Sequence, residues 1–432
     1  MKKYINFFVA LLVLVAYNVA IAQNYKWAVY DSSNTTIKRD KIKDLFIDNA
    51  GDKWFATYSG ATKFDDSNWI TYDTSSSNIP KDAELEMYSI AVQGDSLIHI
   101  GTCGGGLIVF NINKDEWQTF RPSNSAFPSD FVQAIRVDKT GAVWYGTAGK
   151  GPNDGGLVKY KDSVFTVYDT SNSSIPSVKV WDVLIDDTLI WAGTQGGLAK
   201  FDGNNWVVYD TINSDIPDNY VNAMIKDSSG NMWVATENGL GKLNIETETW
   251  KNYTSQNSGL PNDQVWSVMY EPGTKNLWAG TYQGIGIVDS MENWEILDST
   301  NTVIPSNSIY EIKMDADNNI WIATGRGVVF MEDTSKKDTV GLILENFEKQ
   351  NWEIYYTHKQ IQINNFQNKN LTKVELYNLK GQLVQEWNNS NFNGNSNETS
   401  LEVKNLRNGV YFVKLITSLG SKTQKIILFN GL

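Results

Sequence analysis

The sequence predicts an all-β protein, and three observations carry this prediction. The 432 residues include 16 Trp, 20 Tyr and 33 Gly but one Cys, a composition typical of short aromatic strands joined by tight turns. A Thr that ends an apolar strand recurs seven times at spacings of 42 to 47 residues. A Trp-x-x-Tyr-like strand also recurs seven times, but out of phase with the first pattern. Together these patterns predict a seven-bladed β-propeller followed by a small Ig-like β-sandwich.

The first 22 residues have the features of a secretory signal peptide. Lys2 and Lys3 precede an apolar stretch over residues 7–15, and Ala20-Ile21-Ala22 supplies a cleavage site of small residues. We therefore expect Sec signal cleavage near Ala22. The apolar stretch is too short to span a bilayer comfortably, and no other stretch approaches about 20 apolar residues. The mature chain is thus expected to have no integral membrane segment.

The charge of the chain is distributed unevenly. The formal charge is −12 and becomes −14 without Lys2 and Lys3. Residues 341–432 carry ten basic and seven acidic side chains, so residues 23–340 carry about −17. This balance argues against nucleic acid or an anionic membrane surface as the partner. With the polar stretch at 333–338, it predicts a propeller over 23–332, a linker over 333–345 and a C-terminal domain over 346–432.

The repeat defines a unit of four short strands. One complete unit has an apolar strand at 221–225, a turn at 227–230, and further strands at 232–236, 239–243 and 250–253. Four strands at this period are typical of a propeller blade. The repeating strand-end residues are Thr57, Thr102, Thr147, Thr194, Thr236, Thr281 and Thr324.

The two ends of the repeat region complement one another. The fourth-strand pattern occurs at Trp27–Tyr30, Trp69–Tyr72, Trp117–Phe120, Phe165–Tyr168, Trp206–Tyr209, Trp250–Tyr253 and Trp294–Leu297. Its first copy precedes any complete unit, and no copy follows Thr324. Trp27–Tyr30 is therefore expected to pair with Gly327–Met331 and to close the ring, which leaves no inner sheet edge exposed.

One side of the ring is expected to bind a ligand. Successive antiparallel strands send their turns to alternate sides, so the Thr-x-x-Gly loops and the long inter-blade connections share one side, which we call the loop face. Residues that break the repeat pattern there are the candidate ligand-binding residues: Tyr58, Tyr88, Lys150, Asp154, Trp181, Glu237, Trp266, Tyr282, Tyr310 and Arg326. Such a set of aromatic and charged side chains would suit a sugar.

Four of these aromatics occupy one repeat position at the start of the innermost strands. Tyr88, Trp181, Trp266 and Tyr310 stand where other blades have Lys43, Gln133 and Asn222. The alternative is that these aromatics only pack between blades. The second-strand tryptophans have no such ambiguity, because their repeat position is that of the blade core: Trp54, Trp144, Trp191, Trp233, Trp278 and Trp321.

No catalytic set is apparent in the sequence. His99 and His358 are the only histidines, and His99 stands at the core Trp position, which favours a buried structural role. Cys103, the only cysteine, can form no intrachain disulfide and has no evident His partner. The acidic stretch 315–319 falls at an ordinary short turn and lacks the later Glu of a calcium loop. We expect no catalytic residue, metal or cofactor; a carboxylate-only lyase or glycosidase acting on polysaccharide is the alternative.

The repeat resembles that of a known family. The pattern Asp227…Gly230…Trp233…Thr236…Gly239-Leu240 is similar to the two-component regulator propeller repeat, and seven copies cover nearly all of residues 23–332. The resemblance implies an extracellular ligand-binding scaffold, since such propellers often form sensors of membrane-bound kinases that respond to oligosaccharides. This chain lacks the kinase. The repeat is also similar to streptogramin lyase propellers, but the His of that chemistry has no counterpart on the loop face.

The C-terminal segment has a second resemblance. The strands at 374–384, 409–414 and 425–428, with Lys380-Gly381 and Asn408-Gly409 turns, resemble the type A sorting domain of type IX secretion. The resemblance implies that the type IX machinery of a Bacteroidota cell exports the protein to the outer surface or medium. An adhesive Ig-like module is the alternative. The sequence therefore predicts a secreted or cell-surface propeller that binds a glycan or a protein.

Overall fold

A computed structural model describes residues 25–74, 79, 86–94, 96–151 and 154–334, and C-terminal residues 353–357, 360–364, 371–378, 382–388, 398–403, 409–417 and 420–428. These residues contain β-strands and no helix, and they divide into two compact units between Asp333 and Thr334. The predicted signal peptide, most of the predicted linker, and His358 lie outside the described residues. Along the described ranges, no helix could cross a bilayer.

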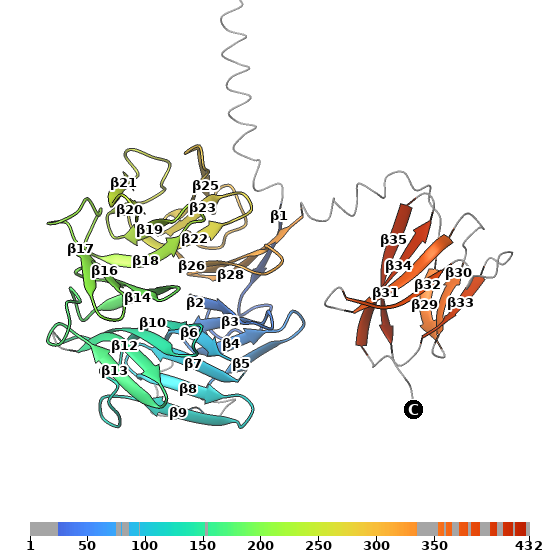
Figure 1. The fold of residues 1–432 in the computed structure, drawn as a ribbon, viewed down its shortest axis with the longest axis horizontal. Coiled ribbons are helices and arrows are strands. Elements are labelled where there is room, and N and C mark those ends of the chain that lie inside the picture. Colours follow the sequence, from blue (N-terminus) through green and yellow to red (C-terminus); the bar gives the residue numbers. More distant parts are fainter. Residues whose placement is uncertain are drawn as a thin grey trace, which may run out of the picture. The chain divides into compact units, whose positions relative to one another are not determined.

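Seven four-stranded antiparallel sheets make up the first unit (Figure 1). Six of them use consecutive strands, numbered from the innermost strand outward. Blade 1 contains β2 (Ile42–Ile47), β3 (Lys53–Thr57), β4 (Gly60–Phe64) and β5 (Trp69–Tyr72). Blade 2 contains β6 (Met87–Gln93), β7 (Leu97–Thr102), β8 (Leu107–Asn111) and β9 (Glu116–Phe120). Blade 3 contains β10 (Val132–Val137), β11 (Val143–Ala148), β12 (Gly155–Lys161) and β13 (Val164–Tyr168).

The remaining blades continue this order around the ring. Blade 4 contains β14 (Val180–Asp186), β15 (Leu189–Thr194), β16 (Gly197–Phe201) and β17 (Trp206–Tyr209). Blade 5 contains β18 (Val221–Lys226), β19 (Asn231–Thr236), β20 (Gly239–Asn244) and β21 (Thr249–Tyr253). Blade 6 contains β22 (Val265–Glu271), β23 (Asn276–Thr281), β24 (Gly284–Val288) and β25 (Trp294–Leu297). Blade 7 contains β26 (Ile309–Met314), β27 (Ile320–Thr324), β28 (Gly327–Asp333) and β1 (Tyr25–Tyr30). This all-β, seven-bladed architecture confirms the predicted fold class.

The N-terminal strand completes the last blade. β1 is antiparallel to β28, with Trp27 opposite Met331 and Tyr30 opposite Val328. The inner strands contact one another in sequence around the ring, and β26 of blade 7 contacts β2 of blade 1. The pairing is the one that the phase mismatch between the two repeat patterns predicts. It leaves the ring without an open edge between its first and last blades.

The core of this unit lies between blades rather than within them. Seven buried apolar clusters each join a pair of neighbouring blades. The six second-strand tryptophans belong to these interfaces or their edges, and none is more than 5% exposed, which confirms their assignment to the core. Each blade is thus stabilised by burial against two neighbours.

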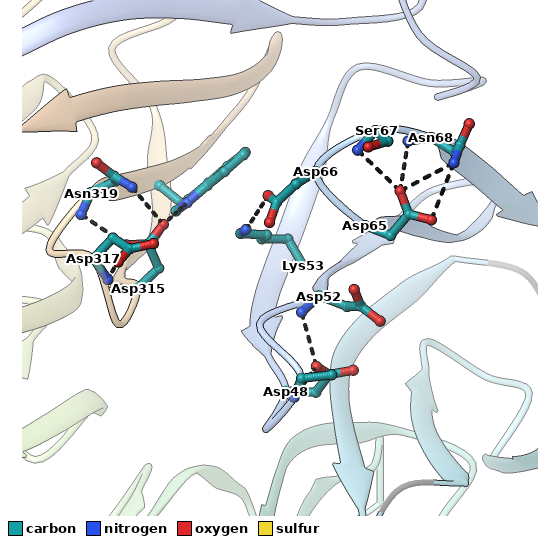
Figure 2. Close-up of polar contacts among 12 residues, drawn as sticks. Asp48, Asp52, Lys53, Asp65, Asp66, Ser67, Asn68, Asp315, Asp317 and Asn319 are labelled. Carbon is teal, nitrogen blue, oxygen red and sulfur yellow. Dashed lines mark hydrogen bonds and ion pairs between the residues drawn. The ribbon is translucent and has the colours of Figure 1, made fainter. Parts of the chain in front are cut away.

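The short turns opposite the loop face fix the second strands. In blades 1, 5 and 7 the first Asp of the turn accepts a 3.0 Å hydrogen bond from the indole Nε1 of the core Trp, in the pairs Asp48–Trp54, Asp227–Trp233 and Asp315–Trp321. Figure 2 shows the turns at Asp48 and Asp315, whose carboxylates also accept bonds from the turn itself, for example from the Asp52 backbone N–H at 2.9 Å. The repeated Asp therefore accepts a hydrogen bond from the buried indole and also stabilises the tight turn. The 315–319 stretch is one such turn.

The junction between blades 1 and 7 also contains a buried cation. The Lys53 side chain points toward Asp66, with which it forms an ion pair (Figure 2). Its Nζ lies 5.3 Å from the ring centroid of Trp321 in blade 7. A cation held over an aromatic face adds to the apolar contact between these blades.

The second unit is a small β-sandwich. One sheet contains β29 (Glu353–Thr357), β30 (Gln360–Asn364) and β33 (Glu398–Glu402); the other contains β31 (Leu371–Asn378), β32 (Leu383–Asn388), β34 (Gly409–Thr417) and β35 (Gly420–Leu428). Its buried core takes residues from both sheets, including Ile361, Leu401, Val374 and Val413. Two sheets packed face to face around one core form a sandwich.

Candidate functional site

Every innermost strand carries the same irregularity at its start. The register shifts by one residue after the first position of β2, β6, β10, β14, β18, β22 and β26, which is a β-bulge. Ile42, the first residue of β2, lies opposite Thr57, so these bulges lie beside the Thr-x-x-Gly loops of the loop face. The seven bulged residues all line one central cavity of about 470 Å³: Lys43, Tyr88, Gln133, Trp181, Asn222, Trp266 and Tyr310. We call it the channel cavity.

The aromatic side chains around this cavity stack on one another. Trp266 lies parallel to Tyr310, with centroids 5.1 Å apart, and edge-on to the half-exposed Tyr282 at 5.5 Å. Trp181 stacks on Tyr220 at 5.1 Å. Trp181, Trp266 and Tyr310 each contact a ring from a neighbouring blade or the connection to it and also line the cavity, so the two interpretations of these inner-strand aromatics are not exclusive. The stacking holds the ring faces in fixed orientations.

Two lysines lie among the tyrosines of blades 7, 1 and 2. The Lys43 Nζ is 4.1 Å from the ring centroid of Tyr310 and 5.0 Å from that of Tyr88. The Lys41 Nζ is 4.6 Å from the ring centroid of Tyr58, which stacks on Tyr88 at 6.2 Å. Burial, with a smaller contribution from Lys41, lowers the pKa of Lys43 to about 8. Sequence analysis noted Lys43 only as a departure from the aromatic pattern and did not select Lys41.

A carboxylate occupies the part of the cavity formed by blade 5. Glu237 accepts hydrogen bonds from the Asn222 and Gln264 side-chain amides, both at 2.9 Å. Burial and the nearby Glu237 charge raise the pKa of Tyr220 to about 12. Two amides thus orient the Glu237 carboxylate.

The other predicted site residues lie away from the channel cavity. Lys150 lines a second pocket of about 660 Å³ together with Tyr58 and Cys103. The Asp154 side chain accepts a bond from the Lys150 backbone N–H at 3.1 Å and so closes its own loop. Arg326 is exposed and lines neither pocket. The structure therefore brings together Tyr88, Trp181, Glu237, Trp266 and Tyr310. Tyr58 stacks on Tyr88, and Tyr282 lies edge-on to Trp266.

Sequence analysis missed a set of charged side chains in the cavity wall. At the position after the bulge, blades 1, 4 and 7 carry Asp44, Asp182 and Glu311, whereas the other blades carry Ser or Ala. Asp182 accepts a 2.8 Å bond from the Arg136 guanidinium. The signal was available in the repeat alignment, because an acidic residue replaces Ser or Ala at a position expected to face the channel.

Asp44 and Asp182 also join adjacent blades. Asp44 accepts the Ile90 backbone N–H at 2.9 Å, and Asp182 accepts the Met224 backbone N–H at 3.0 Å. Burial, reinforced by Glu311, raises the pKa of Asp44 to about 6, and burial likewise raises the pKa of Asp182. Their bonds to the next blade indicate a structural role in the ring.

His99 has the buried position predicted for it. It is 1% exposed, with Nδ1 2.9 Å from the Tyr145 hydroxyl and Nε2 3.0 Å from the Gln93 side chain. Burial lowers its pKa to about 4, so the imidazole is neutral at physiological pH. Over the ranges that the structure describes, no group of three or more His, Cys, Asp or Glu side chains could hold a metal ion.

Comparisons with known proteins agree with this architecture. The family model described as two component regulator propeller matches residues 215–238 and 304–326. The model described as secretion system C-terminal sorting domain matches residues 357–429. A curated relative, histidine kinase P4 of Formosa agariphila, is 26% identical over 290 residues, which are 63% of this chain and 21% of that protein. The chain thus spans about a fifth of that relative's length.

Solved structures show the same fold at low identity. The extracellular domain of the hybrid two component system BT3049 from B. thetaiotaomicron has 18% identity and a TM-score of 0.60, covering 94% of this chain and 60% of that one. PorZ, a surface component of the type IX secretion system of Porphyromonas gingivalis, has 15% identity and a TM-score of 0.57, covering 93% and 61%. Virginiamycin B lyase from Staphylococcus aureus has 13% identity and a TM-score of 0.55, covering 71% and 98%.

The two family matches fall on the two compact units separately. The propeller matches lie in blades 5 and 7 and the connections that lead into them, and the sorting-domain match covers the strands β30 to β35 of the β-sandwich. A sorting domain of this kind is the part of a chain that the type IX secretion machinery recognises. The chain thus has matches to the two component regulator propeller model in its first unit and to the secretion system C-terminal sorting domain model in its second, and these matches indicate a secreted or cell-surface protein.

Proposed function

We propose that the propeller binds a glycan at the channel cavity on its loop face. The observation that carries this proposal is the convergence of all seven bulged residues on one cavity, four of them aromatic. Sugar rings stack their apolar faces on Trp and Tyr, and their hydroxyls bond to amides and carboxylates. Gln133, Asn222 and Glu237 supply such polar groups beside the rings.

The repeat family and the export domain are compatible with this proposal. The chain is similar over 290 residues to a histidine kinase, two of its segments match the propeller repeat model, and its propeller shares the fold of the extracellular domain of a hybrid two component system. A secreted propeller would use the same scaffold for capture of a glycan outside the cell.

Truncation of the aromatic wall tests the proposal. Glycan-array screening of the purified protein would identify a ligand, and calorimetry would then compare Trp266→Ala and Tyr310→Ala with the wild type. We expect each substitution to weaken binding by roughly 30-fold, because buried aromatic contacts of ligands are commonly worth about 2 kcal/mol.

The control is Met291→Ala in the turn between β24 and β25 of the same blade, at the end opposite the loop face. Met291 is 76% exposed, and its substitution should leave the affinity unchanged. Absence of binding to any glycan, or equal losses for all three variants, would refute the proposal. Cleavage of the ligand during the experiment would support the polysaccharide-active enzyme instead.

A further inference from the structure

Some lysines of the propeller are paired with a carboxylate, including Lys313 of the channel cavity, whose Nζ lies 2.9 Å from Glu311. Lys139, Lys226 and Lys251, for example, each form an ion pair with an Asp or Glu. Within the described ranges, no carboxylate lies within ion-pairing distance of Lys41 or Lys43, although the propeller segment is strongly acidic. Both ammonium groups instead lie over tyrosine rings and line the cavity.

An unpaired, partly buried ammonium is costly unless something compensates its charge. Cation–π contacts compensate it only in part, with about 0.5–2 kcal/mol for each contact. The two cations are also near each other, because they lie at alternate positions of one chain segment and both lie near Tyr310, at 5.4 Å for Lys41 and 4.1 Å for Lys43. A bound anion would be attracted to both.

We propose that the glycan bound at the channel cavity is anionic, and that Lys41 and Lys43 bind its carboxylate or sulfate group. This inference rests on the proposed glycan-binding function. The sugar ring that bears the anion lies beside Tyr310 and Trp266, whose parallel rings adjoin the two ammonium groups. Glu237, in blade 5, selects against an anionic group in that part of the cavity.

The ionisation of Lys43 gives the site a pH dependence. Its pKa lies near 8, so the free site loses positive charge as the pH rises through this value, and affinity for an anion falls with it. The charged and titratable groups that lie beside the Lys43 ammonium or influence its pKa are Lys41, Glu86, Tyr88, Cys103 and Tyr310. The other charged side chains that line the same cavity are Asp44, Arg136, Asp182, Glu237, Glu311 and Lys313. Affinity for an uncharged glycan should not follow this profile.

The test uses the intact protein and matched ligands. An array would carry uronic-acid oligosaccharides, sulfated oligosaccharides, their carboxyl-reduced and desulfated counterparts, and a poly-glutamate peptide. Calorimetry would then measure the best anionic ligand and its neutral counterpart at pH 7 and pH 9. We expect the charged ligand to bind at least about tenfold more tightly than its counterpart at pH 7, since a hydrogen bond to a charged group is commonly worth about 1.5–3 kcal/mol.

Variants identify the cations responsible. Lys43→Met and Lys41→Met should each reduce affinity for the anionic ligand about tenfold and leave the neutral ligand within about twofold, whereas Lys43→Arg retains the charge and most of the affinity. Lys242→Met is the matched control. Like the two lysines of the proposed site, Lys242 lies over an aromatic ring, with its Nζ 4.8 Å from the ring centroid of Trp233, but Lys242 lines neither pocket.

The outcomes separate the two proposals. Equal binding of anionic and neutral glycans, or equal effects of Lys43→Met and Lys242→Met, overturns the anionic specificity and leaves glycan binding intact. Preference for poly-glutamate over every saccharide assigns the site to acidic protein segments and overturns both proposals. Absence of all binding by wild-type protein that is folded by circular dichroism also overturns both.

Discussion

Removal of the Tyr30 ring should weaken the joint that closes the propeller. Tyr30 belongs to β1 of blade 7 and contacts aromatic rings on both sides of the closure: Trp69 at 5.1 Å and Phe64 at 6.0 Å in blade 1, and Trp321 at 6.2 Å in blade 7. Aromatic pairs contribute about 0.5–1.5 kcal/mol each beyond area burial, and truncation of a core aromatic costs about 3–5 kcal/mol. Because Tyr30 is only partly buried, we expect Tyr30→Ala to lower the free energy of unfolding by about 2–4 kcal/mol.

Differential scanning calorimetry measures this effect. A unit of roughly 310 residues has an unfolding entropy of about 0.65 kcal/mol per kelvin, so the Tm of the propeller transition should fall by about 3–6 °C. Tyr282→Ala is the control, because this ring is 51% exposed and the structure gives it one aromatic contact; its Tm should fall by less than about 2 °C. The reasoning is refuted if the two variants unfold alike, or if deletion of residues 23–30 leaves the Tm unchanged.

Two further substitutions test buried polar groups. His99→Gln should make the free energy of unfolding less sensitive to acid. The folded-state pKa of His99, near 4, lies below the ordinary value of 6.5. The free energy of unfolding of the wild type therefore falls by up to about 3 kcal/mol as the pH falls from 6.5 toward 4. Urea unfolding at pH 7 and pH 4.5 measures this, and an identical pH slope in the variant would contradict it. Asp182→Ala leaves the Arg136 guanidinium without its carboxylate and should cost about 2–3 kcal/mol at pH 7, whereas Asp187→Ala, which breaks an exposed pair with Lys139, should cost less than about 0.5 kcal/mol. Equal losses in these two variants would argue against a structural role for Asp182.

The fold was predictable because a similar pattern of strands and turns recurs seven times along the chain. A single Trp such as Trp233 could serve core or ligand, but its recurrence at one strand position indicates the core. The closure followed from a count of strands, since Trp27–Tyr30 had no blade of its own. Boundaries between domains, by contrast, depend on composition alone and stay predictions.

The site was predictable in position more than in chemistry. The loop face and the inner-strand aromatics followed from strand alternation. The bulges that turn Trp181 and Lys43 toward one cavity, by contrast, are not associated with any one residue type in the sequence. Lys41 and Asp44 lie on either side of the bulge at Lys43, and their ionisation depends on burial and on partners from other blades. Arg326 and Asp154 were selected because they vary from the repeat, and variation at a loop tip does not place a side chain in a cavity.

The pairing of β1 with β28 constrains the order of events during export. β1 pairs with a strand that lies some 300 residues later in the chain. Blade 7 therefore cannot be completed until almost the whole propeller has emerged. Until then, β1 lacks its partner and is open to pairing with other chains.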